Sequence, residues 1–347
     1  MTVSTPYPVW SDAQWQRQAR DWIDGHLDRC GLRVDGPVEP RLRPWSLVWR
    51  VPTDGGPVWF KANVPATGYE APLVAALSRL VPGAVVAPVA VDPDRGWLLL
   101  PDGGPTLREA TAPRRDGPDP QRPADPVDAR AALARWERAL TGYAELQLAA
   151  VGHVDELLAL GVPDHRPEAL PALLADLLDD RAALRGGADG GLTPETYQRL
   201  RAYQPEFEAL CARLAGSGLP VTVQHDDLHD GNVFVDGGRD RFFDWGDASI
   251  GHPFGTLLVT LRSAAYTFGL EPGDPALVRL RDAYLEPWSA RYDRRTLLAA
   301  VGPAVTTAKV GRSLAWRRAL TTDDPSRAEY ADAVPGWLAE VFEPDPL

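Results

Sequence analysis

The chain has 347 residues, a net charge of −12 and a sequence pI near 5.0, which disfavours binding to nucleic acid through its phosphates. Hydrophobic residues make up 44% of it, and no apolar run approaches the length of a membrane span, so we expect a globular cytoplasmic protein with no membrane, nucleic-acid or protein partner implied. Cys30 and Cys211 are far apart in the sequence, and we expect both to be buried free thiols.

The first hundred residues are expected to form a small sheet with a helix against it. The expected elements are a helix over Ala13–Cys30, strands over Val38–Leu42, Leu47–Val51 and Val58–Val64, a helix over Glu70–Leu80, and strands over Val85–Val91 and Trp97–Leu100. Asp54-Gly55-Gly56 indicates a hairpin between the second and third strands. A small antiparallel sheet is the simplest packing of this order.

The rest of the chain is predicted to be mainly helical. Residues 111–126 are rich in Pro, Asp and Arg and are expected to form a surface loop. Apolar stripes at helical spacing follow, interrupted by short strands over Val221–His225, Val233–Val235 and Arg241–Phe243. We therefore expect an α+β protein of two lobes, with residues 1–102 forming the sheet lobe and residues 103–347 the helical lobe.

One segment, from His225 to Asp244, contains the residue types that phosphoryl transfer requires. That reaction needs oxygen ligands for a cation that screens the phosphates, and a positioned carboxylate to receive the proton of the attacking hydroxyl. Asp227 shortly precedes Asn232, and a predicted hairpin returns Asp244 beside them. Two hard oxygen ligands and one free carboxylate suit Mg²⁺, which shares its other sites with phosphates and water.

Two patterns in this segment, His-x-Asp-Leu-x-x-Gly-Asn and Phe-Phe-Asp-Trp-Gly-Asp, together resemble the aminoglycoside phosphotransferase family, relatives of the protein kinases. The resemblance implies a protein-kinase-like two-lobed fold with residues 1–102 as the nucleotide-binding lobe. It also implies Asp227 as catalytic base, Asn232 and Asp244 as Mg²⁺ ligands, and His225 as a brace for the catalytic loop. His229 is expected to order the same loop. The alternative is that Asp227 and Asp244 are only turn residues.

A kinase-like sheet lobe also needs a strand lysine for the phosphates and a helix glutamate to hold it. Lys61 and Glu70 occupy such positions. Lys61 lies in an otherwise apolar strand, where an unpaired ammonium would be costly. The alternatives are a Lys61 that reaches the surface and a Glu70 that only favours the helix N-terminus.

Three further nucleotide contacts are expected from the resemblance. Related kinases hold adenine at the junction after the last sheet strand, so the Pro101 carbonyl should accept from the base and the Gly103 N–H should donate to it. A plain glycine-rich turn is the alternative there. Ser46 follows Arg43-Pro44-Trp45, which lacks the repeated glycines of protein kinases, yet its hydroxyl and N–H are candidates for a phosphate contact.

The acceptor remains open at this stage. A protein acceptor is disfavoured because little room for an activation loop follows Asp244. His252 and Thr256 replace carboxylates expected from the family pattern, which puts the substrate rather than the reaction in doubt. The acidic loop around Asp226 and Asp230 could attract an amine-bearing antibiotic or amino sugar, or could simply be solvated surface. A metabolite kinase of the sugar, amino-sugar, choline or homoserine type and a non-catalytic nucleotide sensor are the alternatives, and ATP and GTP are not distinguished.

Overall fold

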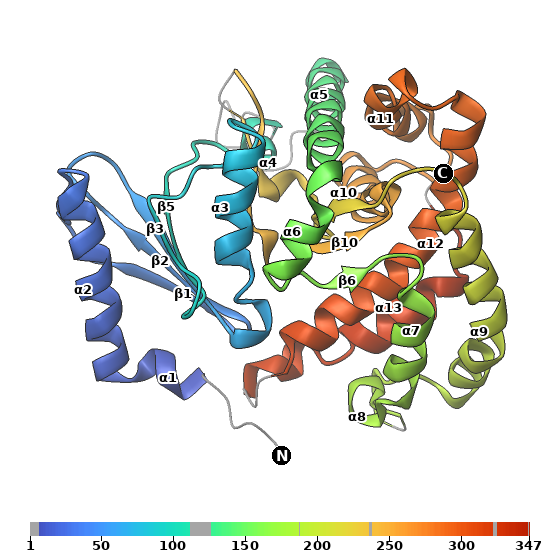
Figure 1. The fold of residues 1–347 in the computed structure, drawn as a ribbon, viewed down its shortest axis with the longest axis horizontal. Helices are drawn as coiled ribbons and strands as arrows, with labels where there is room; N and C mark the ends of the chain where they lie inside the picture. The colour runs from blue at the N-terminus through green and yellow to red at the C-terminus, as the bar shows by residue number, and fades with distance from the viewer. Residues whose placement is uncertain (1–6, 112–125, 187, 236–237, 322–324, 346) are drawn as a thin grey trace.

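The computed structural model describes residues 7–111, 126–186, 188–235, 238–321, 325–345 and 347. Its two-lobed α+β arrangement confirms the fold class predicted from the sequence (Figure 1). The N-terminal part contains a five-stranded antiparallel sheet in the order β1-β2-β3-β5-β4. The strands are β1 (Glu39–Arg43), β2 (Ser46–Val51), β3 (Val58–Asn63), β4 (Ala90–Asp92) and β5 (Trp97–Pro101).

The strand expected over Val85–Val91 is wrong for most of its length, because only Ala90 and Val91 of it pair with β5. Val85 is buried and forms an isolated bridge with Phe242 of the other lobe. Pro88 carries no N–H for a sheet ladder, so the apolar run before it contacts the helical lobe instead of extending β4.

Helices cover both faces of this sheet (Figure 1). Successive strand residues point to opposite faces, so Phe60 and Lys61 face different helices. On one face, α2 (Ala13–Arg29) packs Trp15 and Trp22 onto Phe60 and Trp97, with ring centroids 5.5–6.4 Å apart. On the other face, α3 (Glu70–Leu80) begins beside Lys61. The short helix α1 (Tyr7–Ser11) precedes α2.

The C-terminal lobe is mainly helical. Its helices are α4 (Leu107–Thr111), α5 (Pro126–Ala150), α6 (Val154–Ala159), α7 (Leu170–Asp179), α8 (Arg181–Leu184), α9 (Pro194–Ala215), α10 (Leu257–Phe268), α11 (Pro275–Leu285), α12 (Arg294–Ala319) and α13 (Ala333–Ala339). Short 3₁₀ turns are η1 (Pro65–Thr67), η2 (Val151–His153), η3 (Asp230–Asn232), η4 (Trp245–Asp247), η5 (Pro253–Thr256), η6 (Pro287–Ala290), η7 (Pro325–Tyr330) and η8 (Glu340–Phe342).

Two small strand groups position the segment that carries the chemistry. One is a three-stranded sheet in the order β6-β10-β7, formed by Asp164–His165, Ser249–Gly251 and Thr222–Gln224. The other is a hairpin of β8 (Val233–Phe234) and β9 (Arg241–Phe242). The loop from His225 to Asn232 therefore leaves β7 and enters β8, and the hairpin brings Asp244 back beside it.

The turn between β1 and β2 packs against the helical lobe. Trp45 at this turn lies edge-on to Trp316 of α12 and to Tyr330, with ring centroids 5.4 Å and 5.0 Å away. Aromatic pairs in this geometry add to the energy of area burial. The turn directly before Ser46 therefore packs against the helical lobe.

The two cysteines differ in burial. Cys211 is buried as expected, but Cys30 is exposed, because it is the C-cap of α2 where the chain turns outward. Most of the expected loop over 111–126 lies outside the described residues. In the described part of the chain, no helix combines the length and apolarity that crossing a membrane requires.

Candidate active site

Lys61 joins the two lobes through ion pairs. Its Nζ lies 2.7 Å from Oε2 of Glu70 on α3 and 2.5 Å from Oδ1 of Asp244 after β9. Glu70 is 1% exposed and also accepts a hydrogen bond from Nδ2 of Asn63 at 2.9 Å. The expected lysine–glutamate pair therefore forms, and the surface alternative for Lys61 does not hold, since its side chain is 14% exposed.

Charge and burial act against each other in this trio. Burial would lower the pKa of Lys61, but Asp244 and Glu70 outweigh it and raise the pKa above its ordinary value. Desolvation opposes ionisation of Asp244, and the Lys61 ammonium outweighs that cost, so the pKa of Asp244 is lowered. Burial raises the pKa of Glu70 although Lys61 opposes the shift. The Lys61 ammonium is therefore held between two carboxylates where the lobes meet.

His225 is fully buried at the start of the catalytic loop. Its main-chain N–H donates to the Tyr143 hydroxyl at 2.8 Å, and its Nε2 lies 2.8 Å from the Phe243 carbonyl oxygen. A carbonyl only accepts, so Nε2 carries the proton. Burial lowers the pKa of His225, which keeps the ring neutral. These bonds tie the loop to the residue before Asp244, as the bracing role requires.

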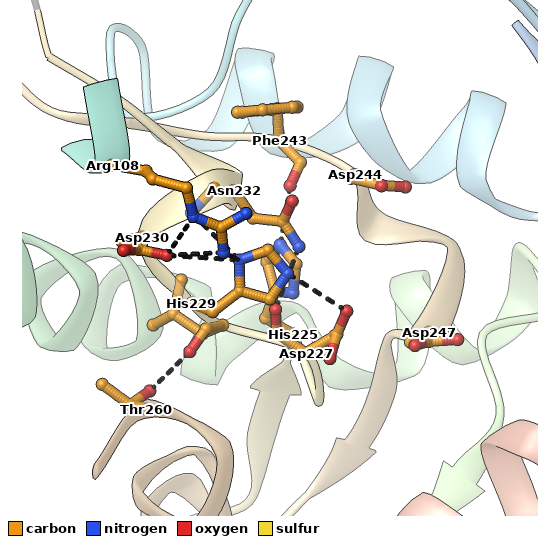
Figure 2. A network of polar contacts seen from close by, with 12 residues as sticks. Arg108, His225, Asp227, His229, Asp230, Asn232, Phe243, Asp244, Asp247 and Thr260 are labelled. Carbon is orange, nitrogen blue, oxygen red and sulfur yellow. Dashed lines mark hydrogen bonds and ion pairs between the residues drawn. The ribbon is translucent and has the colours of Figure 1, made fainter. Parts of the chain in front are cut away.

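Asp227 lies near the middle of the loop with its carboxylate partly exposed (Figure 2). Its main-chain carbonyl accepts a hydrogen bond from Nδ2 of Asn232 at 3.0 Å. A residue of α10 also contacts the loop, because the Thr260 hydroxyl donates to the Leu228 carbonyl at 2.9 Å. The loop geometry therefore fixes Asp227 and Asn232 relative to each other.

His229 lies between a cation and the Asp227 carboxylate, as Figure 2 shows. Its Nδ1 accepts from the Gly231 N–H at 2.9 Å, so the proton is on Nε2, which lies 3.7 Å from Oδ2 of Asp227. Arg108 of α4 pairs with Asp230 at 2.7 Å and approaches the same Nδ1 at 3.4 Å. These contacts support a loop-ordering position for His229.

The sequence interpretation missed Arg312, a buried guanidinium on α12. Its Nη2 lies 3.2 Å from Oδ1 of Asp227, and its Nη1 lies 2.7 Å from Oδ2 of Asp247. Burial alone would lower the pKa of Arg312, but the two carboxylates raise it, so the side chain stays charged. The one feature of the sequence that could have indicated Arg312 is a charged residue within an apolar stretch. That stretch lies far from the two patterns between His225 and Asp247.

Asp226 adopts a left-handed backbone with φ of +60°. Its carboxylate accepts a hydrogen bond from the Ser249 hydroxyl, and Nδ1 of His165 lies 3.9 Å from Oδ2. Burial raises the pKa of Asp226 to about 6. Asp226 and Asp230 are therefore engaged inside the protein, and they are not a free acidic surface for an amine.

The predicted metal ligands have the atoms that Mg²⁺ requires. Asn232 commits its amide nitrogen to the Asp227 carbonyl, so its Oδ1 is the atom left for a cation. Asp244 has a carboxylate held by Lys61 through one oxygen. Within the described residues, no group of three or more His, Cys, Asp or Glu gathers as a metal site. An amide and a carboxylate fit Mg²⁺, which takes most of its other ligands from phosphates and water.

The junction after β5 is ordered by Asp102. Its carboxylate accepts from the Gly104 N–H at 2.7 Å and from Nε1 of Trp59 at 3.1 Å. Gly103 packs against Phe234, and a Cβ built on Gly103 would lie 2.1 Å from that ring. Pro101 is exposed at the end of β5. The contacts of Pro101 and Gly103 with adenine stay predictions.

Ser46 begins β2 opposite Asn63, on the same sheet face as Lys61, but it is only 3% exposed. Ser46 therefore lies on the sheet face where a phosphate bound by Lys61 would lie, but little of its surface is accessible to that phosphate. The contact stays a prediction.

His252 and Thr256 are buried at the two ends of η5, where the His252 main-chain oxygen accepts a hydrogen bond from Nε2 of Gln224 on β7. Nδ1 of His252 accepts from the Phe254 N–H at 3.3 Å, and burial lowers its pKa to about 3. Among the described residues, Nε2 of His252 and the Thr256 hydroxyl have no hydrogen-bond partner. The replacement of carboxylates at these two positions therefore lies in the protein interior and not on an exposed surface.

A sequence profile described as the phosphotransferase enzyme family, APH, matches residues 43–298 of the chain. The chain belongs to this family. Members transfer a phosphoryl group to a hydroxyl, so the protein is a phosphotransferase with a hydroxyl acceptor. Among curated proteins, none matches the chain significantly.

Solved structures of this phosphotransferase fold resemble the protein over nearly its whole length. A choline/ethanolamine kinase family protein from Mesorhizobium loti is 18% identical, with 94% of this chain and 95% of that chain covered and a TM-score of 0.58. An ethanolamine kinase from Plasmodium vivax is 11% identical, with 96% and 89% covered and a TM-score of 0.60. A choline kinase from Streptococcus pneumoniae is 11% identical, with 92% and 99% covered and a TM-score of 0.53. At these identities the likeness establishes the protein-kinase-like fold.

Proposed function

We propose that the protein transfers the γ-phosphoryl group of ATP to a hydroxyl of a small molecule. The observation that carries the proposal is the pairing of Lys61 with both Glu70 and Asp244, which brings a phosphate-binding cation from one lobe to a metal-binding carboxylate from the other. In this proposal residues 1–102 bind the nucleotide and residues 103–347 supply the catalytic loop and the acceptor site.

The proposed reaction assigns a separate role to each residue of the site. Lys61 binds the nucleotide phosphates, and Glu70 keeps it in place. Asp227 orients the acceptor hydroxyl and takes its proton through Oδ2, because Oδ1 faces Arg312. Asn232 and Asp244 would hold Mg²⁺, which neutralises charge on the phosphates when it is bound. Pro101 and Gly103 would hold adenine, and Ser46 is a weaker candidate for a phosphate contact.

The candidate acceptors of this reaction are an amine-bearing antibiotic or amino sugar and a metabolite. Binding of an amine would require carboxylates on the loop from His225 to Asn232 that have no partner of their own. Asp230 is 3% exposed and paired with Arg108, and Asp227 and Asp247 share Arg312. These contacts favour an acceptor without a strong positive charge, such as a sugar, over a strongly cationic one.

The test is acceptor-dependent release of ADP or GDP from Mg-ATP or Mg-GTP, measured across a panel of sugars, amino sugars, aminoglycosides and amino alcohols. Asp227→Ala should keep nucleotide affinity and lose turnover by several orders of magnitude, on the order of 10³ or more. Asp244→Ala should lose Mg-nucleotide binding. Asp28→Asn, on the exposed face of α2, controls for loss of a carboxylate.

Two outcomes would contradict the assignment. Equal loss of nucleotide binding in Asp227→Ala and Asp244→Ala would remove the distinction between base and metal ligand. Tight binding of ATP without turnover of any acceptor would favour a nucleotide sensor that has kept the fold.

A further inference from the structure

A cavity of about 860 Å³ lies in the helical lobe between β6, the α7–α8 segment and the C-terminal part of α12. Pockets that bind small molecules usually have volumes of about 300–1,000 Å³. Its lining includes His165 of β6, Arg185 after α8, and Arg317 and Arg318 of α12. Its size is therefore suitable for a small molecule.

The cavity adjoins the catalytic segment at two points. Nη2 of Arg318 donates to the Asp247 main-chain oxygen at 3.4 Å and to the Tyr69 hydroxyl at 3.2 Å. His165 is the second point, since its Nδ1 lies 3.9 Å from Oδ2 of Asp226. Asp226 directly precedes Asp227, and Asp247 shares Arg312 with it. A molecule in the cavity would thus lie beside the residues that flank the base.

The charged residues of the lining favour an anion. The lining contains three arginines, Arg185, Arg317 and Arg318, and two carboxylates, Asp164 and Asp180. His165 adds no charge, because burial and Arg318 lower its pKa to about 3. The lining is therefore positive in a chain whose net charge is −12.

The two lining carboxylates are already engaged. Asp164 makes two contacts with the guanidinium of Arg166, at 2.9 Å and 2.7 Å. Asp180 caps α8 by accepting from the Ala183 N–H at 3.0 Å and lies 3.9 Å from Arg317. These carboxylates therefore offer little to a cationic ligand.

Arg318 differs from its neighbours on α12 in having no carboxylate partner among the described residues. Its Nε is buried and has no hydrogen-bond partner in that part of the chain, and the same holds for Nη1 of Arg317. Arg317 does pair with Asp176 at 2.7 Å, and Arg312 pairs with two carboxylates. Because these two atoms are shielded from solvent, the feature of Arg318 that a ligand would meet is its charge, which no carboxylate of the described residues pairs with. A carboxylate or phosphate in the cavity would pair with that charge well.

We propose that this cavity is the acceptor site and that the acceptor carries a carboxylate or phosphate group, which Arg318 binds. The inference rests on the proposed kinase function, because it identifies the class of acceptor for that reaction. Arg317 lies beside the same group, and the acceptor hydroxyl extends from the cavity toward Asp227.

The experiment uses four acceptors that share a hexose ring: glucosamine, glucose, glucuronate and glucose 6-phosphate. With Mg-ATP, at least one anion should show a kcat/KM about 10–100-fold above that of glucosamine. Arg318→Gln should lose most of this preference, and Arg318→Lys should keep part of it. Arg262→Gln is the matched control, since Arg262 pairs with Glu340 outside the cavity and should keep the full preference. Thermal melting confirms that each variant folds.

Binding measured by calorimetry with ADP present separates this inference from the kinase function. Loss of anion binding in Arg318→Gln, without turnover of any acceptor by the wild type, would support the cavity and contradict the kinase. Turnover that favours glucosamine, or anion binding that is equal in Arg318→Gln and the wild type, would overturn the cavity proposal and leave the kinase intact. Failure of both anions to bind more tightly than glucosamine would also overturn it. Comparing glucuronate with glucose 6-phosphate distinguishes a carboxylate from a phosphate ligand.

Discussion

Nη2 of Arg312 lies 3.2 Å from Oδ1 of Asp227, although the two residues are on separate elements of the helical lobe. The same guanidinium holds Asp247 at 2.7 Å. One buried cation thus fixes the orientation of the proposed base and of the turn that follows Asp244. The other oxygen, Oδ2, lies 3.7 Å from Nε2 of His229, too far for a hydrogen bond, and it is the oxygen that we propose accepts the proton of the acceptor.

Replacing Arg312 with Met should lower turnover on the order of 10²-fold with little change in the KM for ATP, because the base loses its orientation while the nucleotide site is untouched. Unfolding free energy should fall by about 1–3 kcal/mol, less than for a fully buried pair because both carboxylates keep contact with water. Steady-state kinetics and urea denaturation measure the two effects. Arg262→Gln controls for loss of a guanidinium on the same lobe, and a matching loss of turnover there would contradict the role.

Asp226 should make stability depend on pH. Its folded pKa of about 6 lies above the ordinary value of 3.8, so its ionised form disfavours the folded state above pH 6. Asp226→Asn should therefore stabilise the protein by about 1–3 kcal/mol at pH 8, and the gain should shrink from pH 6 to pH 4 as the wild-type carboxyl is protonated. Asn also tolerates the left-handed backbone at this position.

The measurement for Asp226 is urea unfolding of wild type and variant at pH 8, 6 and 4. Asp28→Asn removes an exposed carboxylate of α2 and provides the baseline. A constant difference between Asp226→Asn and wild type across the three pH values would show that burial does not shift this group.

Gly103→Ala should destabilise the junction by roughly 1–3 kcal/mol and weaken nucleotide binding, because the added Cβ would lie 2.1 Å from the Phe234 ring. Phe234 stacks on Phe243 with centroids 3.9 Å apart, so the ring has little freedom to move. The second substitution Phe234→Leu should restore part of the loss. Gly142→Ala on α5 is the control, since a Cβ there meets nothing within 4 Å. Equal effects of both alanines would exclude the clash as the cause.

Lys61→Met should weaken ATP binding and destabilise the fold by about 3–5 kcal/mol, because it leaves the Glu70 carboxylate buried without its main partner. Adding Glu70→Gln should recover part of the stability and none of the ATP affinity. Calorimetric titration with Mg-ATP and urea denaturation of the single and double variants measure both. Recovery of ATP affinity in the double variant would show that Lys61 does not bind phosphate.

The local elements were readable from the sequence because each depends on neighbouring residues. The spacing of Leu73, Ala76, Leu77 and Leu80 predicted α3 over the range at which it forms. Asp54-Gly55-Gly56 predicted the turn between β2 and β3. The expected strand over Val85–Val91 was wrong because its apolar residues contact Phe242, and periodicity does not reveal a partner in the other lobe.

The family, the two-lobed fold and the candidate residues for the reaction could be read from the sequence, because those residues stand in short patterns of fixed spacing. The tertiary structure determined which charges meet. It placed Arg312 against Asp227, enclosed Asp226 and Asp230 with partners, and left Arg318 facing a cavity. Pairing between distant residues depends on how the helices pack. The residues next to an arginine on α12 therefore do not indicate which carboxylate it will contact. The class of acceptor therefore depends on charges that the fold brings together, whereas the candidate residues for the phosphoryl donor stand in local patterns of the chain.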